Sequence, residues 1–443
     1  MILGGFGLVY AQTGSILLSA IGLSIGGSSW ALLLFIGGFF IKLGGLGVHV
    51  WLPDAYAESD DDFTAMMSSV VSKAGVFGLF VVGSYMSAQL NDIESTMIVI
   101  GWIGLIMAVA GAIMAAMSED IKHLLAYSSI GQLGYVVTSF AMANHVGWVA
   151  ALYLAVNHLL YKGLIFIAIA GVLYRVKTRY MYEMGGLIKN MPITFVSVLI
   201  GIITISGVPP LMGFGGKWLL YNALLERGWY LQAGLAFFGS AVAFLYLFKL
   251  IHTIFLGQRK SEHEHIKEAP LPLLIPQVIF MIAIMGFSMF PNVLIQPLSD
   301  AVAPYFASTF TWDGYLLQTQ NGYWNGFLVM NIVGALFLAP LILLWLVSKK
   351  MKVQKVKQFN IVFAAERPFT PATTHYAYSF YGFYDKALGF LTKPDATGFW
   401  NGVAEWSHTL GSSIRRFYTG NGQTYAGLIL FYIGVMYLAV RTL

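Results

Sequence analysis

Cysteine is absent from this chain of 443 residues, and charged residues make up only 10% of it. Without cysteine the chain forms no disulfide bond and ligates no haem or iron–sulfur centre through a thiolate. Soluble domains carry about 25% charged residues, whereas 58% of these residues are apolar and the mean hydropathy is +0.72. The composition excludes a soluble protein and, with its long apolar runs, predicts an all-α integral membrane protein.

Long apolar runs divide the chain into predicted membrane spans. Windows of about 20 apolar residues, the length that a helix needs to cross a bilayer, predict about 11 transmembrane helices. The windows lie near 4–26, 29–51, 63–88, 95–117, 122–143, 146–174, 191–225, 229–256, 270–290, 325–348 and 424–441. Aromatic residues spaced among polar ones at 359–423 are instead typical of an amphipathic segment in the membrane interface, with an ordinary cytoplasmic loop as the alternative.

Basic residues are concentrated in the loops at 175–190, 257–269 and 349–357, which follow the sixth, eighth and tenth predicted spans. The positive-inside rule predicts that these loops, and with them the amphipathic segment, are cytoplasmic and that the C-terminus at Leu443 lies outside. The net charge of +5 is therefore no sign of nucleic acid binding. We expect an integral protein of a prokaryotic inner membrane, surrounded by lipid.

Four lysines lie inside predicted spans, where an ionisable side chain costs roughly 2.5–3.5 kcal/mol and is by default a functional-site hypothesis. They are Lys42, Lys73, Lys162 and Lys217. A desolvated lysine can gain and lose a proton during turnover. His158 lies one helical turn before Lys162 on the same face and can pass a proton at physiological pH. These five residues predict a proton relay.

Three further residues allow two interpretations each. His49 is either an intake or interface group of the relay or a packed core residue. Lys249 and His252, one turn apart near the end of the eighth span, are interpreted as side chains that snorkel to water, with membership of the relay as the alternative. The acids at 60–62 either attract cations or form a solvated turn.

Helix breakers interrupt two of the predicted spans. Pro209 and Pro210 precede Lys217, and Gly44, Gly45 and Gly47 follow Lys42. Non-helical backbone at membrane depth is tolerated only where it faces protein or water, and a broken helix beside a charge is a recurring ion site in transporters. By the predicted orientation the two spans run in opposite directions. We therefore predict two discontinuous helices related by an inverted repeat.

Four parts of the sequence resemble a known family. They are HVWLPDAYAE at 49–58 with MMSSVVSKAGVFG at 66–78, DIKHLLAYSSIGQLGY at 120–135, NHLLYKGLIF at 157–166 and GVPPLMGFGGKW at 207–218. They resemble the antiporter-like, proton-conducting subunits shared by respiratory complex I, Mrp-type sodium/proton antiporters and membrane-bound hydrogenases. The resemblance implies that the lysine of the first broken helix, the bridging lysine, the central lysine with its histidine and the terminal lysine are Lys42, Lys73, Lys162 with His158, and Lys217.

The resemblance also implies two departures from the family. Asp60, Asp61 and Asp62 stand where the family usually has Pro-Thr-Pro. Residues 1–15 resemble the family's sixth helix, so we expect about five preceding spans, with the glutamate that pairs with Lys42, to be supplied by another chain or segment. The predicted organisation is the remainder of a first repeat at 1–94, a second repeat at 95–256, two further spans with a basic loop at 257–358, the interfacial segment at 359–423 and a last span at 424–443.

The favoured function is a proton-translocating (or Na⁺/H⁺-exchanging) subunit of a multi-subunit membrane complex. The sequence shows no redox motif, nucleotide fingerprint or metal cluster, so we expect no cofactor in this chain and a driving reaction in partner subunits, such as a quinone- or hydrogenase-linked translocase. Two alternatives stay open. The chain is a membrane subunit of an ion-coupled inorganic-carbon (CO₂/bicarbonate) uptake complex, or it is a scaffold whose buried lysines are vestigial.

Overall fold

The structure of the chain is a computed structural model that describes residues 1–25, 29–86, 94–257, 261–348, 396–415, 423 and 425–433. The chain divides into two units, Met1–Thr392 and Lys393–Leu443. The second unit contains α19 (Ala396–Arg415), an exposed helix that falls within the predicted interfacial segment. The predicted basic loop at 349–357 lies outside the described residues, as does half of the predicted span at 424–441.

The first helices of unit 1 include an interrupted span. Helices α1 (Ile2–Thr13) and α2 (Ala20–Ile25) precede α3 (Ser29–Leu43), and the chain restarts as α4 (Trp51–Glu58) and α5 (Asp61–Met66). Left-handed backbone at Gly44 and Gly47 ends α3, because glycine adopts positive φ without a steric penalty. A π-helical turn, η1 (Met67–Val71), joins α5 to α6 (Lys73–Met86).

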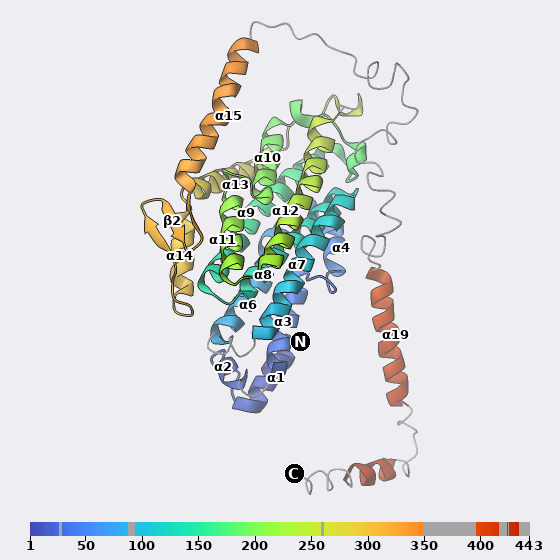
Figure 1. Cartoon of the computed structure of the whole chain (residues 1–443). Coiled ribbons are helices and arrows are strands. Elements are labelled where there is room, and N and C mark those ends of the chain that lie inside the picture. The colour runs from blue at the N-terminus through green and yellow to red at the C-terminus, as the bar shows by residue number, and fades with distance from the viewer. Residues whose placement is uncertain are drawn as a thin grey trace. The chain divides into compact units, whose positions relative to one another are not determined.

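The core of unit 1 is formed by α7 (Glu94–Met117), α8 (Ile121–Ala141) and α9 (His145–Val176), which Figure 1 shows inside the helix bundle. Almost every residue of α8 is buried. α7 and α8 approach closely, since a Cβ added at Gly134 would lie 2.4 Å from the carbonyl oxygen of Gly104. Small residues at such crossings allow helix backbones to pack tightly within a membrane.

The second interrupted span consists of α10 (Pro192–Ser206) and α11 (Met212–Glu226), and α12 (Tyr230–Ile251) follows it. The break contains Gly207, in left-handed backbone, and a cis bond between Pro209 and Pro210. A second π-helical turn, η5 (His252–Leu256), ends α12. Short 3₁₀ helices lie in the connecting loops: η3 (Met181–Glu183), η4 (Leu187–Lys189) and η6 (Ser261–His263).

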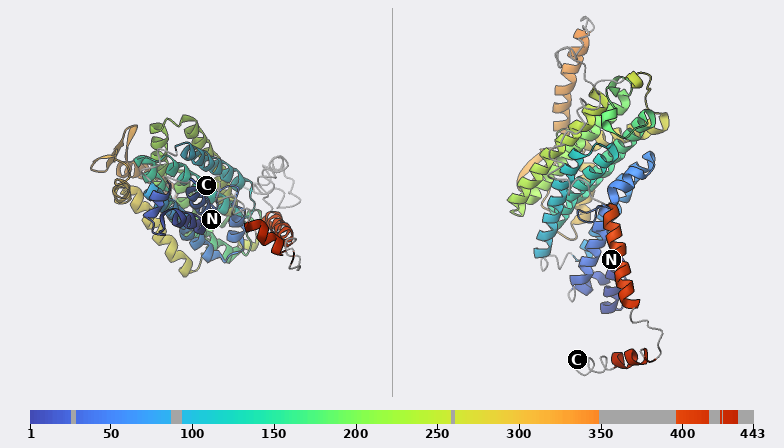
Figure 2. Two further views of the ribbon diagram at one scale, coloured as in Figure 1. Left: turned by 90° about the horizontal axis from the view of Figure 1, so that it is seen from below. Right: turned by 90° about the vertical axis from the view of Figure 1, so that its right-hand side faces the viewer.

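The predicted all-α class is corrected by a small antiparallel sheet that follows α13 (Leu271–Met289) and α14 (Asn292–Val302). Its strands are β1 (Thr311–Asp313), β2 (Leu316–Thr319) and β3 (Gly322–Asn325), and Figure 2 shows them at one side of the bundle. Cross-strand pairs place Trp312, Leu317 and Trp324 on one face. Windows of about 20 residues miss such short strands, because their signal is alternation joined by two-residue turns.

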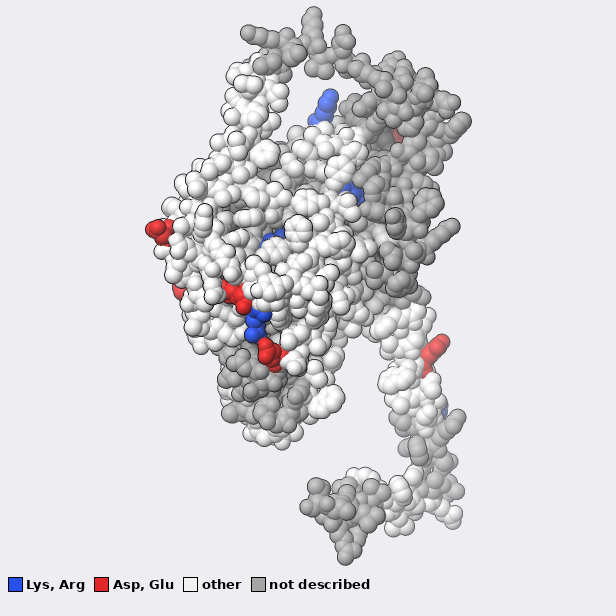
Figure 3. Space-filling model, in the orientation of Figure 1, with Lys and Arg blue, Asp and Glu red and all other residues white. Residues whose placement is uncertain are grey.

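Six described segments are long and apolar enough to cross a membrane: 61–86, 94–117, 145–176, 230–256, 271–289 and 326–344. The last of these belongs to α15 (Gly326–Ser348). They match six of the predicted windows, whereas 29–51 and 191–225 are interrupted as predicted. On the face seen in Figure 3, few of the described residues are charged. A mostly helical membrane fold is thus confirmed, and the full number of spans stays a prediction.

Candidate functional site: a buried row of lysines

Lys162 lies near the middle of α9 with none of its surface exposed. Its ammonium donates to the carbonyl of Leu125 (2.8 Å) and the hydroxyl of Ser128 (2.5 Å), both on α8. The ring of Phe166, one turn further along α9, lies 5.6 Å from the ammonium. Each of these partners is neutral. The positive charge is therefore held by dipoles and a ring, and it can leave as a proton without exposing an unpaired carboxylate.

Lys73 and His158 meet across 85 positions of sequence. The Lys73 ammonium contacts Nδ1 of His158 and also donates to the carbonyl of Ser68 (2.6 Å) and the hydroxyl of Ser72 (3.1 Å). Ser68 lies in η1, and the π-helical turn displaces its carbonyl from the α-helical pattern. A charged Lys73 donates to Nδ1, whereas a neutral Lys73 accepts from an Nδ1–H. The pair can therefore share one proton.

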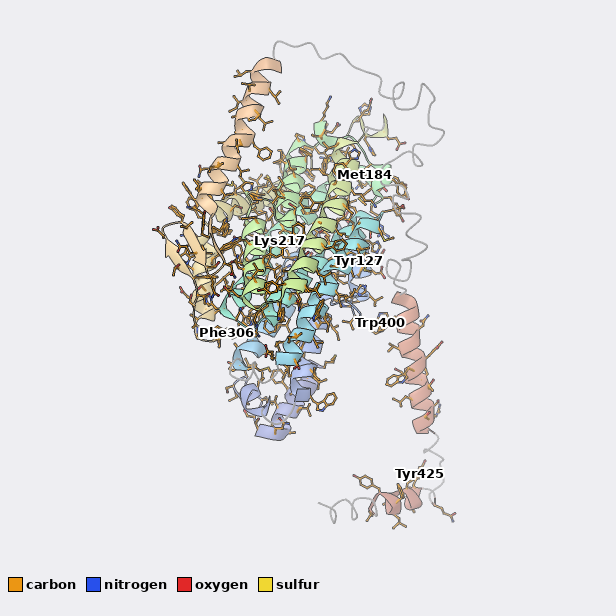
Figure 4. The ribbon with its side chains drawn as sticks, in the orientation of Figure 1. Tyr127, Met184, Lys217, Phe306, Trp400 and Tyr425 are labelled. Atoms are coloured by element: carbon orange, nitrogen blue, oxygen red, sulfur yellow. The ribbon has the colours of Figure 1, made fainter. Side chains whose placement is uncertain are left out.

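Lys217 lies in the second turn of α11, 5% exposed, and inside the bundle between Met184 and Phe306 in Figure 4. Its ammonium donates to the carbonyl of Ser206 at the end of α10, at 2.9 Å. Helix ends leave such carbonyls unpaired, so the break supplies the acceptor. A Cβ at Gly207 would lie 2.5 Å from the Lys217 stem. Only glycine fits both this contact and the local backbone.

Hydroxyl and amide side chains on one face of α8 lie between Lys162 of α9 and Lys217 of α11. Ser128, which contacts Lys162, and Gln132 hydrogen-bond the hydroxyl of Tyr246. The ring of Tyr135 lies 5.6 Å from the Lys217 ammonium. Positions 128, 132 and 135 share one helix face, and the outer two are about 10 Å apart along the axis. We call Lys73, His158, Lys162 and Lys217 the lysine row, and these α8 groups lie between Lys162 and Lys217.

Sequence reasoning did not identify Ser128, Gln132, Tyr135 or Tyr246 as site residues. The first three lie in the stretch 120–135, which served only to establish the family resemblance. Their spacing of four and three residues in a predicted span was a signal, since it places polar side chains on one helix face. Tyr246 carried no such signal, because a tyrosine in an apolar helix is usually a packing residue.

Lys42 and His49 are not joined to the lysine row. Lys42 is exposed in the last turn of α3 and has no hydrogen-bond or ion-pair partner among the described residues. His49 lies in the first break, where its Nδ1 accepts from the amide of Gly47 (3.2 Å). Its ring lies 6.5 Å from that of Tyr127, and its buried Nε2 has no partner among the described residues. The site roles of both residues stay predictions.

Lys249 corrects the snorkelling interpretation. Its side chain is 1% exposed, and its ammonium donates to the carbonyls of Ala116 (3.2 Å) and Ser118 (2.8 Å), at the C-terminal end of α7. Carbonyls at a helix end replace the water that a snorkelling ammonium would reach. His252 is half-buried and stacks on Phe248 at 5.3 Å. The acceptors of the Lys249 ammonium lie outside the lysine row.

Charged side chains gather where α4, α5, α8 and the loop after α9 meet. Lys122 pairs with Asp61 (2.7 Å), and Arg179 pairs with Asp120 (2.7 Å) and Glu58 (3.2 Å). Asp120 also caps α8 by accepting from two backbone amides. Burial alone would raise the pKa of Asp120, but His123 and the Arg179 guanidinium hold that pKa below its ordinary value. The ion pairs join the elements around a cavity of about 970 Å³.

A family described as "NADH:quinone oxidoreductase/Mrp antiporter, TM" matches residues 1–243, and the chain belongs to this family. The chain is 27% identical to NADH-quinone oxidoreductase subunit N of Desulforudis audaxviator, over 68% of this chain and 64% of that protein. It is 29% identical to a Na⁺/H⁺ antiporter protein of Alkalihalophilus pseudofirmus, over 75% of this chain and 46% of that protein.

A solved structure extends the comparison to the whole chain. The membrane-bound sulfane sulfur reductase, described as an archaeal respiratory membrane complex, contains a chain with a TM-score of 0.83 and 30% identity. The similarity covers 100% of this chain and 74% of that one. The predicted family resemblance is therefore confirmed. The chain spans 64% and 46% of the length of the two curated relatives named above.

Proposed function

We propose that this chain is the proton-translocating, antiporter-like subunit of a multi-subunit membrane complex whose other subunits perform the driving reaction. The observation that carries the proposal is the contact of Lys73 with His158, one turn from the fully buried Lys162. Membership of the family supports it. The similarity to a chain of an archaeal respiratory complex supports a redox-driven parent. These relatives give no support to the carbon-uptake alternative.

The lysine row suggests an order of proton steps. A proton on Lys73 moves along its contact to Nδ1 of His158 and leaves an imidazolium. That charge, one turn from Lys162, raises the energy of a second positive charge there, because like charges repel strongly in a medium of low dielectric constant. Lys162 then releases its proton to the Ser128 hydroxyl, which passes its own hydrogen to Tyr246. Tyr246 releases its own hydrogen in turn, and the hydrogen-bonded groups end there, because Lys217 faces the ring of Tyr135 while the Tyr135 hydroxyl bonds Ala236 and Ser240.

The side chains of the row favour H⁺ over Na⁺. A metal cation of this hard type prefers several oxygen ligands, usually including carboxylates. The buried polar residues of the described chain include one acid, Asp120, which lies outside the row at the start of α8. Ammonium and imidazole groups repel a metal cation when charged, yet they exchange protons readily. We therefore assign proton transfer to the row.

We also propose the predicted topology and repeat organisation. Asn190 donates to the carbonyl of Ile266 (2.8 Å), and Arg175 donates to that of Glu268 (2.7 Å). The loops that hold them therefore share one end of the bundle, which supports the alternation used to place them in the cytoplasm. The breaks after α3 and α10 support an inverted repeat across 1–94 and 95–256. With this orientation we also propose a prokaryotic inner membrane and an outward C-terminus.

A neighbouring polypeptide or segment is proposed to complete the first break. Lys42 is exposed and unpaired among the described residues, although a lysine at bilayer depth needs a partner. We place its acidic partner outside the described residues of this chain. A structure of the assembled complex with Lys42 paired to an acid of this same chain would contradict the assignment.

Transport by the assembled complex in sealed vesicles tests the proposed function. Lys162→Ala should reduce proton pumping at least 10-fold per assembled complex, because the row loses its central proton carrier. Lys162→Arg should reduce proton pumping to a similar degree, since a guanidinium does not deprotonate in a protein. Lys189→Ala, which removes an exposed lysine of η4, is the matched control. Full pumping by Lys162→Ala would favour the scaffold alternative instead.

A further inference from the structure

The cavity of about 970 Å³ is lined by acids of the α4–α5 connection, by the start of α8, by the end of α9 and by the start of α13. Asp60, Asp61 and Asp62 line the cavity together with Lys122, Lys177 and Arg179, and the ion pairs of Arg179 add Glu58 and Asp120, so that five carboxylates adjoin three basic side chains. A cavity with excess negative charge concentrates cations, including hydronium. We call it the acidic cavity.

Lys122 is the most tightly held residue of the acidic cavity. Its ammonium pairs with Asp61 (2.7 Å) and donates to the carbonyls of Ser59 (2.7 Å) and Ala57 (3.3 Å). These contacts use the three donors that an ammonium has. Lys122 is 4% exposed, whereas the Asp61 side chain is 42% exposed. The cation is thus fixed at the inner side of the cavity, and its carboxylate partner faces the open side.

Two helices lead from the acidic cavity to Lys162. On α8, Lys122 lies three residues before Leu125, whose carbonyl accepts from the Lys162 ammonium. That separation is about 5 Å of helix rise. On α9, Ala170 lines the cavity, and Phe166 lies between it and Lys162 on the same helix face. The floor of the cavity is therefore close to the lysine row.

A short barrier separates the floor from the row. The rings of Tyr56 and Phe166 are packed edge to face with centroids 5.7 Å apart. Tyr56 is 1% exposed, and the next residue, Ala57, supplies one of the carbonyls that hold Lys122. Release of Lys122 would free one acceptor position of that carbonyl, which also accepts from Arg179 (3.2 Å), beside a cavity that is large enough for water. Water would then have a polar partner next to the ring pair.

We propose that the acidic cavity is the proton intake of the lysine row and that the Lys122–Asp61 ion pair is its gate. With the pair closed, the Lys122 charge repels hydronium at the floor of the cavity and the ring pair excludes water. With the pair open, water reaches the Leu125 carbonyl and the Lys162 ammonium. The inference rests on the proposed proton transport.

Water access past the gate is measured directly by cysteine labelling, because the native chain has no cysteine. Ser129→Cys places a thiol on α8 beyond Lys122, at a site with no exposed surface. In the assembled complex, we expect a membrane-impermeant cationic thiol reagent to modify this cysteine at least 10-fold faster when Lys122→Ala is added. Lys122→Arg, which keeps a cation among the same oxygens, should keep labelling slow.

Two more variants keep the labelling test decisive. Asp61→Asn changes a side chain that is 42% exposed, so assembly should tolerate it, and labelling should rise several-fold. Glu58→Gln weakens only the more exposed contact with Arg179 and should leave labelling unchanged. Labelling at the native rate in both Lys122→Ala and Asp61→Asn would overturn the gate. If Lys122→Ala does not assemble, the native rate in Asp61→Asn overturns it alone.

Passive proton flux separates the gate from the proposed function. Under an imposed pH gradient, with the driving reaction absent, Lys122→Ala should raise proton leak through the complex at least 5-fold. Adding Lys162→Ala should abolish that leak. Faster labelling with a leak that does not need Lys162 would support the gate and contradict the lysine row. Loss of pumping in Lys162→Ala, with labelling unaffected by Lys122→Ala, would support the row and overturn the gate.

Discussion

The lysines of the two interrupted helices differ in their exposure and in their hydrogen-bond partners. Lys217 follows its break, is 5% exposed and donates to the carbonyl of Ser206 on the preceding half-helix. Lys42 precedes its break and is exposed. At the end of α3 the Ile41 carbonyl is instead taken by the amide of Gly44 (3.0 Å) and the indole of Trp51 (3.2 Å). The same sequence feature, a lysine beside a helix break, thus forms a buried site at Lys217 and an exposed site at Lys42.

The surroundings of each break explain the difference. α11 packs against α8, α9, α10, α12 and α13, and Trp324 of β3 covers it at Gly215. α3 contacts α1, α2 and α6. A helix break frees backbone carbonyls, but the packed neighbours decide whether a lysine or the chain itself uses them. The second break is complete within this chain, and the first leaves room for a partner.

Substitution of Lys217, the buried lysine, should have the largest effect on proton pumping. Lys217→Arg keeps a positive charge beside the Ser206 carbonyl but cannot release a proton. We expect at least a 10-fold loss of pumping per assembled complex, close to the loss in Lys217→Ala. The measurement is vesicle transport, with Lys189→Ala as the control for surface charge. Full transport by Lys217→Arg would mean that the buried site needs only a fixed charge.

The positions of Lys42 and Lys217 should differ in their accessibility to a chemical reagent. Lys42→Cys in the isolated chain should react with a polar thiol reagent at least 10-fold faster than Lys217→Cys, because Lys42 is exposed and Lys217 is buried. In the assembled complex Lys42→Cys should become protected, since a neighbour is proposed to cover the first break. Equal reactivity of Lys42→Cys in both preparations would remove the proposed neighbour.

Glycine substitutions at the two breaks should separate strain from loss of function. Gly207→Ala and Gly44→Ala both place a side chain in left-handed backbone, at φ 72 and 71, and should each destabilise the fold by about 1–3 kcal/mol. Gly44→Ala also displaces the buried side chain of Leu52 (2.3 Å), whereas Gly207→Ala displaces the buried stem of Lys217, so only Gly207→Ala should lower pumping several-fold. Gly14→Ala, at φ 67 with open space around it, controls for strain alone. Thermal unfolding and transport are the two measurements.

Loss of the ion pairs of Asp120 at the start of α8 should give the smallest effect, and it should depend on pH. The folded state holds the pKa of Asp120 below its ordinary value. Its stabilisation is therefore present above the unfolded pKa and is lost as pH falls through the folded pKa. Asp120→Asn should lower the unfolding temperature at pH 7 and should lose that difference in strong acid. Asp120→Ala should remove about 1 kcal/mol more, because it also loses the helix cap.

The sequence predicted some types of site residue and missed others. The buried lysines were predictable because a charge in an apolar run has few explanations. Their hydroxyl and amide partners on α8 were not, since serine and tyrosine occur in ordinary membrane helices. The prediction for Lys249 was wrong for a related reason. Its position near the end of a predicted span suggested water, whereas the end of α7 provides the carbonyls that it binds.

The sequence by itself determined the membrane class, the two breaks and the family, because each follows from local composition or from short motifs. Only the tertiary structure decided which lysines share a path. Lys73 meets His158 across 85 positions, and Lys122 of α8 meets Asp61 of α5. Such contacts depend on how helices pack, and a hydrophobic bilayer pattern leaves that packing unspecified. The physical reason is that apolar burial is non-directional, whereas an ammonium needs particular oxygens or a ring nitrogen at hydrogen-bonding distance.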